Sequence, residues 1–351
     1  MATNKLATYS GVSTKIRAMS VNLITDEQFN QISNFKHVEE LIAFLQTNPS
    51  YSKALAHMDP SMMRRSEFEK RMHFSTFSDF SKIYHFVGKK QKQFLNFFFK
   101  EYETALLKVC IRNILDYRVP DKIEVAHDFF ERLAPFDLDE VTSAKDMDSL
   151  IDCLKETEYY EPLMTVHAID NPTLFDYEMG LDLFFFKYIW EKKHDFVPRG
   201  EMGIFDEAFG SKIDLLNILW VYRCKVYYNI TPSQIYSFLI PIHFHIDEET
   251  LKSLVDAKDM DAFYDTLSNT HFGNEFGFNP EISMESQFGD YMYQINQTQF
   301  KESPYSIACI NSFFYLKNLE VSRVITAMEC IRYGYEPEKI LEFVNKKRGV
   351  L

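Results

Sequence analysis

The chain has 351 residues, of which 46% are hydrophobic and 25% are charged, a balance that excludes a disordered protein. This length exceeds what one small core requires, so we expect several domains or a repeat array. The net charge of −13 argues against nucleic acid as a general partner, because binding to phosphates requires a basic surface. Only 11 Gly and 12 Pro are present, and since tight β-turns depend on these residues, their scarcity favours helices over sheets.

The charge is unevenly distributed along the chain. Residues 1–120 contain 17 Lys and Arg against 11 Asp and Glu, whereas residues 121–351 contain 21 against 40. Two interpretations are open: chance variation between solvated faces, or two regions that face partners of different charge.

The cysteines and the apolar stretches indicate a cytosolic protein. The five cysteines are odd in number, are widely spaced and include no C-x-x-C pair, so we expect neither a disulfide framework nor a zinc site. The N-terminus is polar, without the apolar core of a secretory signal, and the longest apolar stretches are too short to span a bilayer.

In chain order, the first recurring element is an amphipathic helix that is expected three times. Ala144–Leu154 and Ala257–Leu267 begin with the same five residues, 113 positions apart, and continue with apolar residues at i, i+3, i+4 and i+7. Val38–Leu45 repeats that apolar face. Each copy is followed by a threonine and an aromatic residue: Thr47 and Tyr51, Thr157 and Tyr160, Thr270 and Phe272.

A second element recurs later in each copy. Glu103–Arg112, Asp214–Arg223 and Glu320–Glu329 each begin with an acid and have an aromatic residue five positions before it. A third, weaker block lies between the other two in every copy. Three blocks in the same order, three times, indicate an internal repeat of roughly 110 residues.

The repeat predicts an all-α fold of three pseudo-symmetric helical-bundle units. Repeat one covers residues 1–118, repeat two 119–230 and repeat three 231–351, with Pro120 and Pro232 near the joins, where a helix should stop. We expect each repeat to be a small helical bundle whose exposed apolar edge is covered by its neighbour.

Two pairs of aspartates resemble metal ligands at first sight. Asp146 and Asp148 match Asp259 and Asp261, each pair at the start of an expected helix. Acids at that position accept hydrogen bonds from the free N–H groups and favour the positive end of the helix dipole. Because a catalytic metal site would not be expected twice beside the same helix start, we interpret both pairs as helix caps.

The segment with His243, His245 and Asp247 has the alternation of a metal-binding strand. No second ligand cluster follows at a recognisable spacing, so a structural or surface role is favoured. The sequence contains no phosphate-binding loop and none of the common hydrolase motifs. We therefore expect no catalytic residue, no cofactor and no metal. The aromatic runs Phe97–Phe99, Phe184–Phe186 and Phe313–Tyr315 are interpreted as core or inter-unit packing.

Several segments carry a resemblance to a known family. Tyr9 with Lys15-Ile-Arg17-Ala-Met19 resembles the start of the central-stalk C subunit of A/V-type ATPases, the counterpart of the eukaryotic d subunit. The acid-led blocks are similar to that family's recurring acid–Asn–Arg helices, and Gly334–Ile340 is similar to its closing Gly-x-Pro-Pro-Glu-x-Ile. Ser322-Arg323 and Glu329-Cys330 depart from the Arg-Asn and Arg-Gly common in the family. The resemblance makes these residues candidates for structural or interface roles: Tyr9, Arg17, Arg112, Asp214, Asn217, Arg223, Glu320 and Arg323.

The resemblance implies a non-catalytic rotor part of a V-type ATPase or ATP synthase. Three similar bundles would form a funnel or socket that receives the D and F subunits of the rotor shaft and rests on the membrane proteolipid ring. The protein would then be peripheral on the cytoplasmic face, would act in ion transport such as that of H⁺, and would bind no small-molecule substrate directly.

Two other hypotheses stay open from the sequence. A free-standing helical-repeat adaptor of the same ancestry would keep the fold without the complex, and the departures in repeat three leave room for it. An enzyme with an unfamiliar site would have His243, His245 and Asp247 as its candidate residues.

Overall fold

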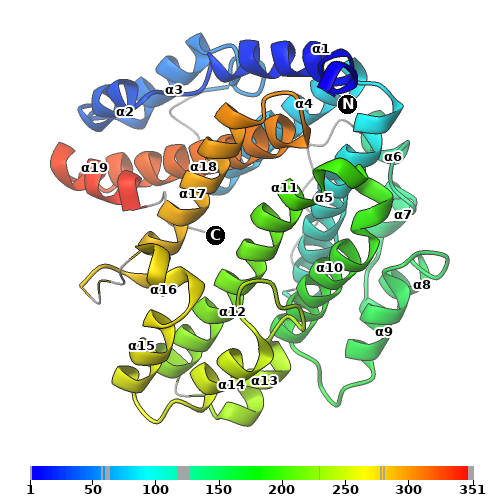
Figure 1. Cartoon of the computed structure of the whole chain (residues 1–351). Helices are drawn as coiled ribbons and strands as arrows, with labels where there is room; N and C mark the ends of the chain where they lie inside the picture. Colours follow the sequence, from blue (N-terminus) through cyan, green and yellow to red (C-terminus); the bar gives the residue numbers. More distant parts are fainter. Residues whose placement is uncertain are drawn as a thin grey trace. The chain divides into compact units, whose positions relative to one another are not determined.

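The computed structural model of the chain describes residues 2–56, 58–59, 64–116, 127–228, 230–276, 279 and 281–346. Within these residues the regular structure is helical and no strand is present, which confirms the predicted all-α class (Figure 1). The helices of the N-terminal half are α1 (Ala2–Ser20), α2 (Asp26–Ser33), α3 (Val38–Thr47), α4 (Arg65–Phe86), α5 (Lys89–Leu115), α6 (His127–Glu131), α7 (Leu138–Ser143), α8 (Met147–Asp152), α9 (Tyr160–His167) and α10 (Leu174–Phe196). Those of the C-terminal half are η2 (Arg199–Glu201), α11 (Met202–Phe205), η3 (Asp206–Gly210), α12 (Ser211–Arg223), η4 (Cys224–Tyr228), α13 (Pro232–Phe238), α14 (Glu248–Asp256), α15 (Met260–Ser268), α16 (His271–Phe276), α17 (Met284–Glu302), α18 (Ile307–Arg332) and α19 (Pro337–Lys346).

The chain forms two compact units, each assembled from separate stretches of sequence. The first contains residues 1–87, 200–219 and 243–351, and the second contains residues 88–199 and 220–242. This division concerns the packing of helices, whereas the three repeats concern sequence similarity, so the repeat boundaries stay a prediction. The boundary at 118/119 and Pro120 lie outside the described residues.

Helix α18 is the centre of the first unit. It packs against α1, α2, α3, α4, α17 and α19, and α19 also contacts α2 (Figure 1). Because α18 is surrounded, it buries residues on all its faces, including Phe313 and Phe314. One hydrophobic cluster of this unit joins apolar residues of α2, α3, α4, α18 and α19, among them Phe29, Ile42, Phe68, Met328 and Val344.

The second unit is built on the pairing of α5 with α10. Helix α9 packs against α10, and α7 packs against α5 (Figure 1). The phenylalanines of the α5 and α10 runs meet in this core: Phe97–Phe99, Phe185 and Phe186 are buried, and the rings of Phe97 and Phe185 stack. The interpretation of these runs as core packing is confirmed for the buried residues, while Phe184 is only half-buried.

The predicted helix caps are present. The Asp146 carboxylate accepts from the Ser149 N–H of α8 at 2.8 Å, and the Asp259 carboxylate accepts from the Ala262 N–H of α15 at 2.8 Å. These contacts satisfy donors that the first helical turn leaves free, which confirms the capping interpretation for both residues. Asp148, in contrast, lies 3.0 Å from Nε2 of His167.

The repeated amphipathic helices correspond to α3, α8 and α15. Their predicted apolar faces are turned inward, with Leu45, Leu154 and Leu267 fully buried at equivalent positions. In the described part of the chain, no helix combines the length and apolarity that crossing a bilayer requires.

Candidate functional site

The three acids that begin the second recurring element are all buried. Glu103 of α5 is 1% exposed, Asp214 of α12 is 2% exposed and Glu320 of α18 is 4% exposed. A buried carboxylate is costly unless it is hydrogen-bonded or paired with a charge, so its partners indicate what the site does. We call these three places the Glu320 site, the Glu103 site and the Asp214 site.

At the Glu320 site the carboxylate accepts three hydrogen bonds. The donors are the backbone N–H of Ile24, the hydroxyl of Tyr51 and the ammonium of Lys317, whose Nζ is 3.0 Å away. Lys317 has no exposed surface, and its Nζ also lies 3.7 Å from the centre of the Tyr51 ring. Burial and the adjacent Glu320 raise the pKa of Tyr51 well above its usual value, so its hydroxyl keeps the donated proton.

The Glu103 site likewise pairs the acid with one tyrosine hydroxyl and one lysine. The Glu103 carboxylate accepts from the Tyr159 hydroxyl at 2.6 Å and from the Lys100 Nζ at 2.7 Å. Lys100 also forms an ion pair with Glu158. Burial raises the pKa of Glu103 even though the Lys100 ammonium lowers it. The tyrosine that donates to Glu103 is Tyr159, which directly precedes Tyr160, the aromatic residue of this copy in the repeat pattern.

The Asp214 site is satisfied by backbone alone. The Asp214 carboxylate accepts from the N–H groups of Phe244, His245 and Ile246 at 3.2, 2.6 and 3.2 Å. Ser211 stands three residues before Asp214, where the other two sites have lysine. Burial raises the pKa of Asp214 to about 6, although the three N–H groups act in the opposite direction.

The three sites connect segments that belong to different predicted repeats. Tyr51 of repeat one meets Glu320 of repeat three, Tyr159 of repeat two meets Glu103 of repeat one, and the 244–246 segment of repeat three meets Asp214 of repeat two. Each acid therefore fixes the short helices of one repeat to the long helix of another. Such links resist separation of the helices because opening any of them would leave a buried charge without partners.

The remaining predicted residues of the first unit have varied environments. Tyr9 is buried and its hydroxyl bonds to Glu201, whose carboxylate also accepts from the Ile307 N–H at 2.7 Å. Arg17 is exposed on α1, and Asn217 is buried on α12. Thus Tyr9 and Asn217 lie in the interior, while Arg17 is available at the surface.

The arginines of the acid-led blocks form local pairs. Arg323 Nη2 donates to Asp26 Oδ1 at 3.0 Å and to Asn345 Oδ1 at 3.3 Å, and its guanidinium lies over the Phe29 ring. Arg323 therefore has polar partners within its own unit, despite the departure of its block from the family pattern.

In the second unit Arg112 pairs with Glu178, and Arg223 is half-buried at the end of α12.

The structure separates the candidates His243, His245 and Asp247. His243 is exposed, and Asp247 caps α14 by accepting from the Thr250 N–H at 2.8 Å. His245 instead lies beside Glu207 and His271, with its Nε2 3.4 Å from the Glu207 carboxylate. Sequence spacing could not reveal this cluster because its three members come from separate segments.

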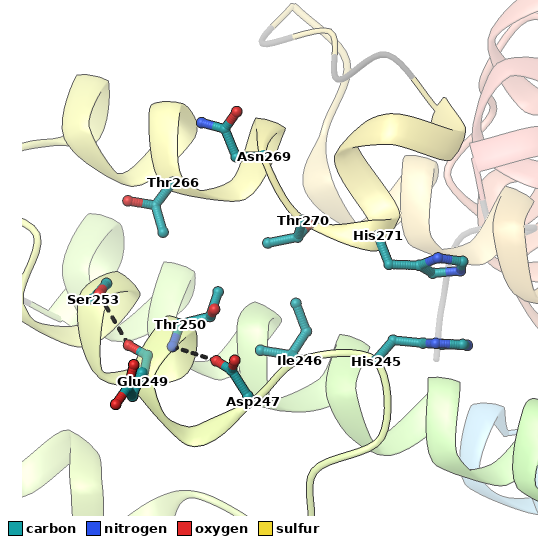
Figure 2. Close-up of a pocket in the computed structure, with 10 residues that line it drawn as sticks. All are labelled: His245, Ile246, Asp247, Glu249, Thr250, Ser253, Thr266, Asn269, Thr270 and His271. Atoms are coloured by element: carbon teal, nitrogen blue, oxygen red, sulfur yellow. Dashed lines mark hydrogen bonds between the residues drawn. The ribbon is translucent and has the colours of Figure 1, made fainter.

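The cluster borders a hollow of about 500 Å³ between α14 and α15. Figure 2 shows the imidazole rings of His245 and His271 one above the other at one end of this hollow, pointing in the same direction. Their centroids are 3.9 Å apart and the rings are 19° from parallel. The hollow is otherwise lined by polar groups of α14 and α15, among them Thr250, Ser253 and Thr266.

Comparison with known proteins agrees with the sequence resemblance. A sequence profile described as "ATP synthase (C/AC39) subunit" matches residues 12–343. The C subunit of the A-type ATP synthase of Thermococcus kodakarensis is 25% identical to this chain, and the alignment covers 97% of this chain and 92% of that protein. The corresponding A-type ATP synthase protein of Pyrococcus abyssi is 22% identical, with 97% and 91% covered. The similarity thus extends over nearly the full length of each relative.

Proposed function

Since the chain belongs to the ATP synthase (C/AC39) subunit family, we propose that it is a non-catalytic central-stalk subunit of a rotary ATPase. In this role it connects the D and F subunits of the rotor shaft to the proteolipid ring, on the cytoplasmic face of the membrane. The observation that carries the proposal is the family match over residues 12–343, together with relatives that are named as C subunits of A-type ATP synthases and match along almost their whole length.

The buried carboxylate sites support a mechanical role. A part that passes torque must not yield between its helices, and each site fixes two segments that are distant in sequence. Breaking one of them costs several kcal/mol, of the order of 3–5 where a buried ion pair loses one partner. The charged groups found in the interior are therefore engaged in holding helices together. The three-bundle socket that the family resemblance implies is part of this proposal.

Copurification from membranes tests the assignment. A strain carrying an affinity tag on this chain is solubilised in a mild detergent, and we expect the shaft and ring proteins to elute with it. A second strain with the tag on a catalytic head protein shows that the complex survives solubilisation. The proposal fails if the head protein brings down the complex without this chain, or if this chain elutes alone under the same conditions.

Loss of the gene separates a coupling role from that of a free-standing adaptor. Membrane vesicles from a deletion strain should lose ATP-driven ion pumping, and expression of the wild-type chain should restore it. An adaptor outside the complex would leave pumping unchanged. The partners of Arg323 within its unit remove one reason for the adaptor hypothesis, since the departures in repeat three do not leave that residue unpaired.

A further inference from the structure

We propose that Glu207, His245 and His271 form a binding site for a divalent transition-metal ion, with Zn²⁺ as the ion that suits the ligands best. Each residue offers one ligand atom, and the three atoms lie within 4.8 Å of one another. This inference concerns only the first compact unit and does not depend on the proposed function.

The ligand set is chemically appropriate for zinc. Two imidazoles and one carboxylate are a common three-residue set, which leaves a fourth position for water. Ligand atoms on a tetrahedral Zn²⁺ with bonds of 2.0–2.1 Å are about 3.3 Å apart, close to the 3.4 Å between His245 Nε2 and the Glu207 carboxylate. The rings are 19° from parallel, and since the lone pair of an imidazole nitrogen lies in the ring plane, the two rings must rotate apart before both direct a nitrogen at one ion.

The backbone around the ligands is held in place. His245 donates its own N–H to Asp214, between the similar bonds from Phe244 and Ile246. A side chain at Gly210 would come within 2.6 Å of the Phe244 ring, so η3, which carries Glu207, is packed directly against the segment that carries His245. A π-helical turn such as η3 is rare and often occurs at functional sites.

His271 also has a hydrogen-bonding partner on one of its two ring nitrogens. Its Nε2 lies 3.1 Å from the Tyr291 hydroxyl, which in turn bonds to Ser211. Such a contact fixes the orientation and the tautomer of an imidazole ligand. All three ligands are half-buried, and His245 and His271 line the hollow of Figure 2, so an ion can reach them from solvent.

The three carboxylate sites differ in a way that gives a reason for a cation here. The Glu320 and Glu103 sites each contain a lysine, whereas at the Asp214 site the matching residue is Ser211. The surroundings of the Asp214 site are acidic, with Glu207 and Glu275 both acting on His245. A dication bound to Glu207, His245 and His271 would supply the positive charge that lysine supplies in the other two sites.

Titration of the full-length chain tests the site. Protein purified with a chelator and then dialysed is titrated with ZnCl₂ in a calorimeter, and we expect one Zn²⁺ per chain. Replacement of a ligand, in H245A, H271A or the isosteric E207Q, should weaken the Kd at least tenfold. The matched control is His243→Ala, which removes an exposed histidine from the same loop and should change the Kd less than twofold.

Cobalt gives an independent readout. Co²⁺ added to the wild-type chain should produce the visible absorption of a tetrahedral nitrogen and oxygen site, and E207Q should lose it while keeping a wild-type circular dichroism spectrum. The proposal is overturned if the wild-type chain binds no Zn²⁺, or if the ligand variants bind as tightly as H243A. It would also be overturned by H243A losing affinity to the same degree as H245A.

Discussion

At the Glu320 site a buried lysine and a tyrosine hydroxyl donate most of the hydrogen bonds that the carboxylate accepts. At the Asp214 site three N–H groups of one loop donate them. The two acids occupy matching positions in two repeats. Side-chain partners make the Glu320 site dependent on residue identity, because without the Glu320 carboxylate Lys317 would be a buried charge with no partner of opposite sign. Backbone partners make the Asp214 site dependent on loop conformation instead. Ser211 and Phe272, which occupy the positions of Lys317 and Tyr51 in their copies, therefore do not have to supply a hydrogen bond to the acid.

The largest expected effect is that of Glu320→Ala. This substitution removes the acceptor of three buried donors, one of them charged, so the free energy of unfolding should fall by about 3–5 kcal/mol. Urea denaturation measures this change. Glu329→Ala, nine residues further along α18, removes a half-exposed pair with Arg65 and should cost at most about 1 kcal/mol. Equal losses in the two variants would contradict the importance of the Glu320 site.

Asp214→Ala should have the next largest effect, about 2–4 kcal/mol, because three N–H groups lose their acceptor but no lysine is left unpaired. Asp214→Asn keeps one acceptor oxygen of similar shape and should recover at least half of the loss. The same denaturation series tests both variants. If Asp214→Ala proved more damaging than Glu320→Ala, the distinction between backbone and side-chain partners would be wrong.

Gly210→Ala examines the loop conformation on which the Asp214 site depends. The added Cβ would lie 2.6 Å from Cγ of Phe244, so the ring and its segment must move, at a cost of about 1–3 kcal/mol. Gly203→Ala is a matched control, since a Cβ there has no neighbour within 4 Å. Thermal unfolding should show a lower midpoint for the first variant only, and a wild-type midpoint for Gly210→Ala would argue against the close packing of η3.

The smallest effect is expected for Tyr51→Phe and Tyr159→Phe. Each variant removes one hydroxyl that donates to a buried carboxylate and should cost about 1–2 kcal/mol. The Glu320 and Glu103 sites each pair the acid with one tyrosine and one lysine, so the two losses should agree within about 1 kcal/mol. Tyr160→Phe, one residue from Tyr159 and half-buried, should change little. A larger loss for Tyr160→Phe than for Tyr159→Phe would reverse the assignment of the buried partner.

The sequence predicted the elements well because helical periodicity and capping are local. The apolar faces of α3, α8 and α15 and the caps at Asp146 and Asp259 depend only on residues within two turns. The acid-led blocks could also be located, since three copies were present in one chain. A lysine stands three residues before the acid in two copies, as Lys100–Glu103 and Lys317–Glu320. This i, i+3 pair is a further signal in the sequence, which a comparison of the acids alone does not include.

The partners of these elements could not be predicted in the same way. Tyr51 and Glu320 are 269 positions apart, and nothing local indicates which acid a tyrosine will meet. The repeat pattern includes Tyr160, whereas its neighbour Tyr159 makes the buried contact with Glu103, and only the packing of the helices distinguishes the two. The cluster of Glu207, His245 and His271 forms only when three segments of the chain come together. The spacing of these residues in the sequence therefore does not predict it.

The contacts of Glu320 with Ile24 and Tyr51 have a consequence for how the protein is made. Helices α2 and α3 follow α1 and emerge from the ribosome early, yet the acid that anchors them is synthesised almost 300 positions later. At 5–20 residues per second, they wait roughly 15–60 s before their partner exists. During that interval the apolar surface that α18 and α19 cover in the folded protein is exposed, so we expect this stretch of the nascent chain to bind chaperones.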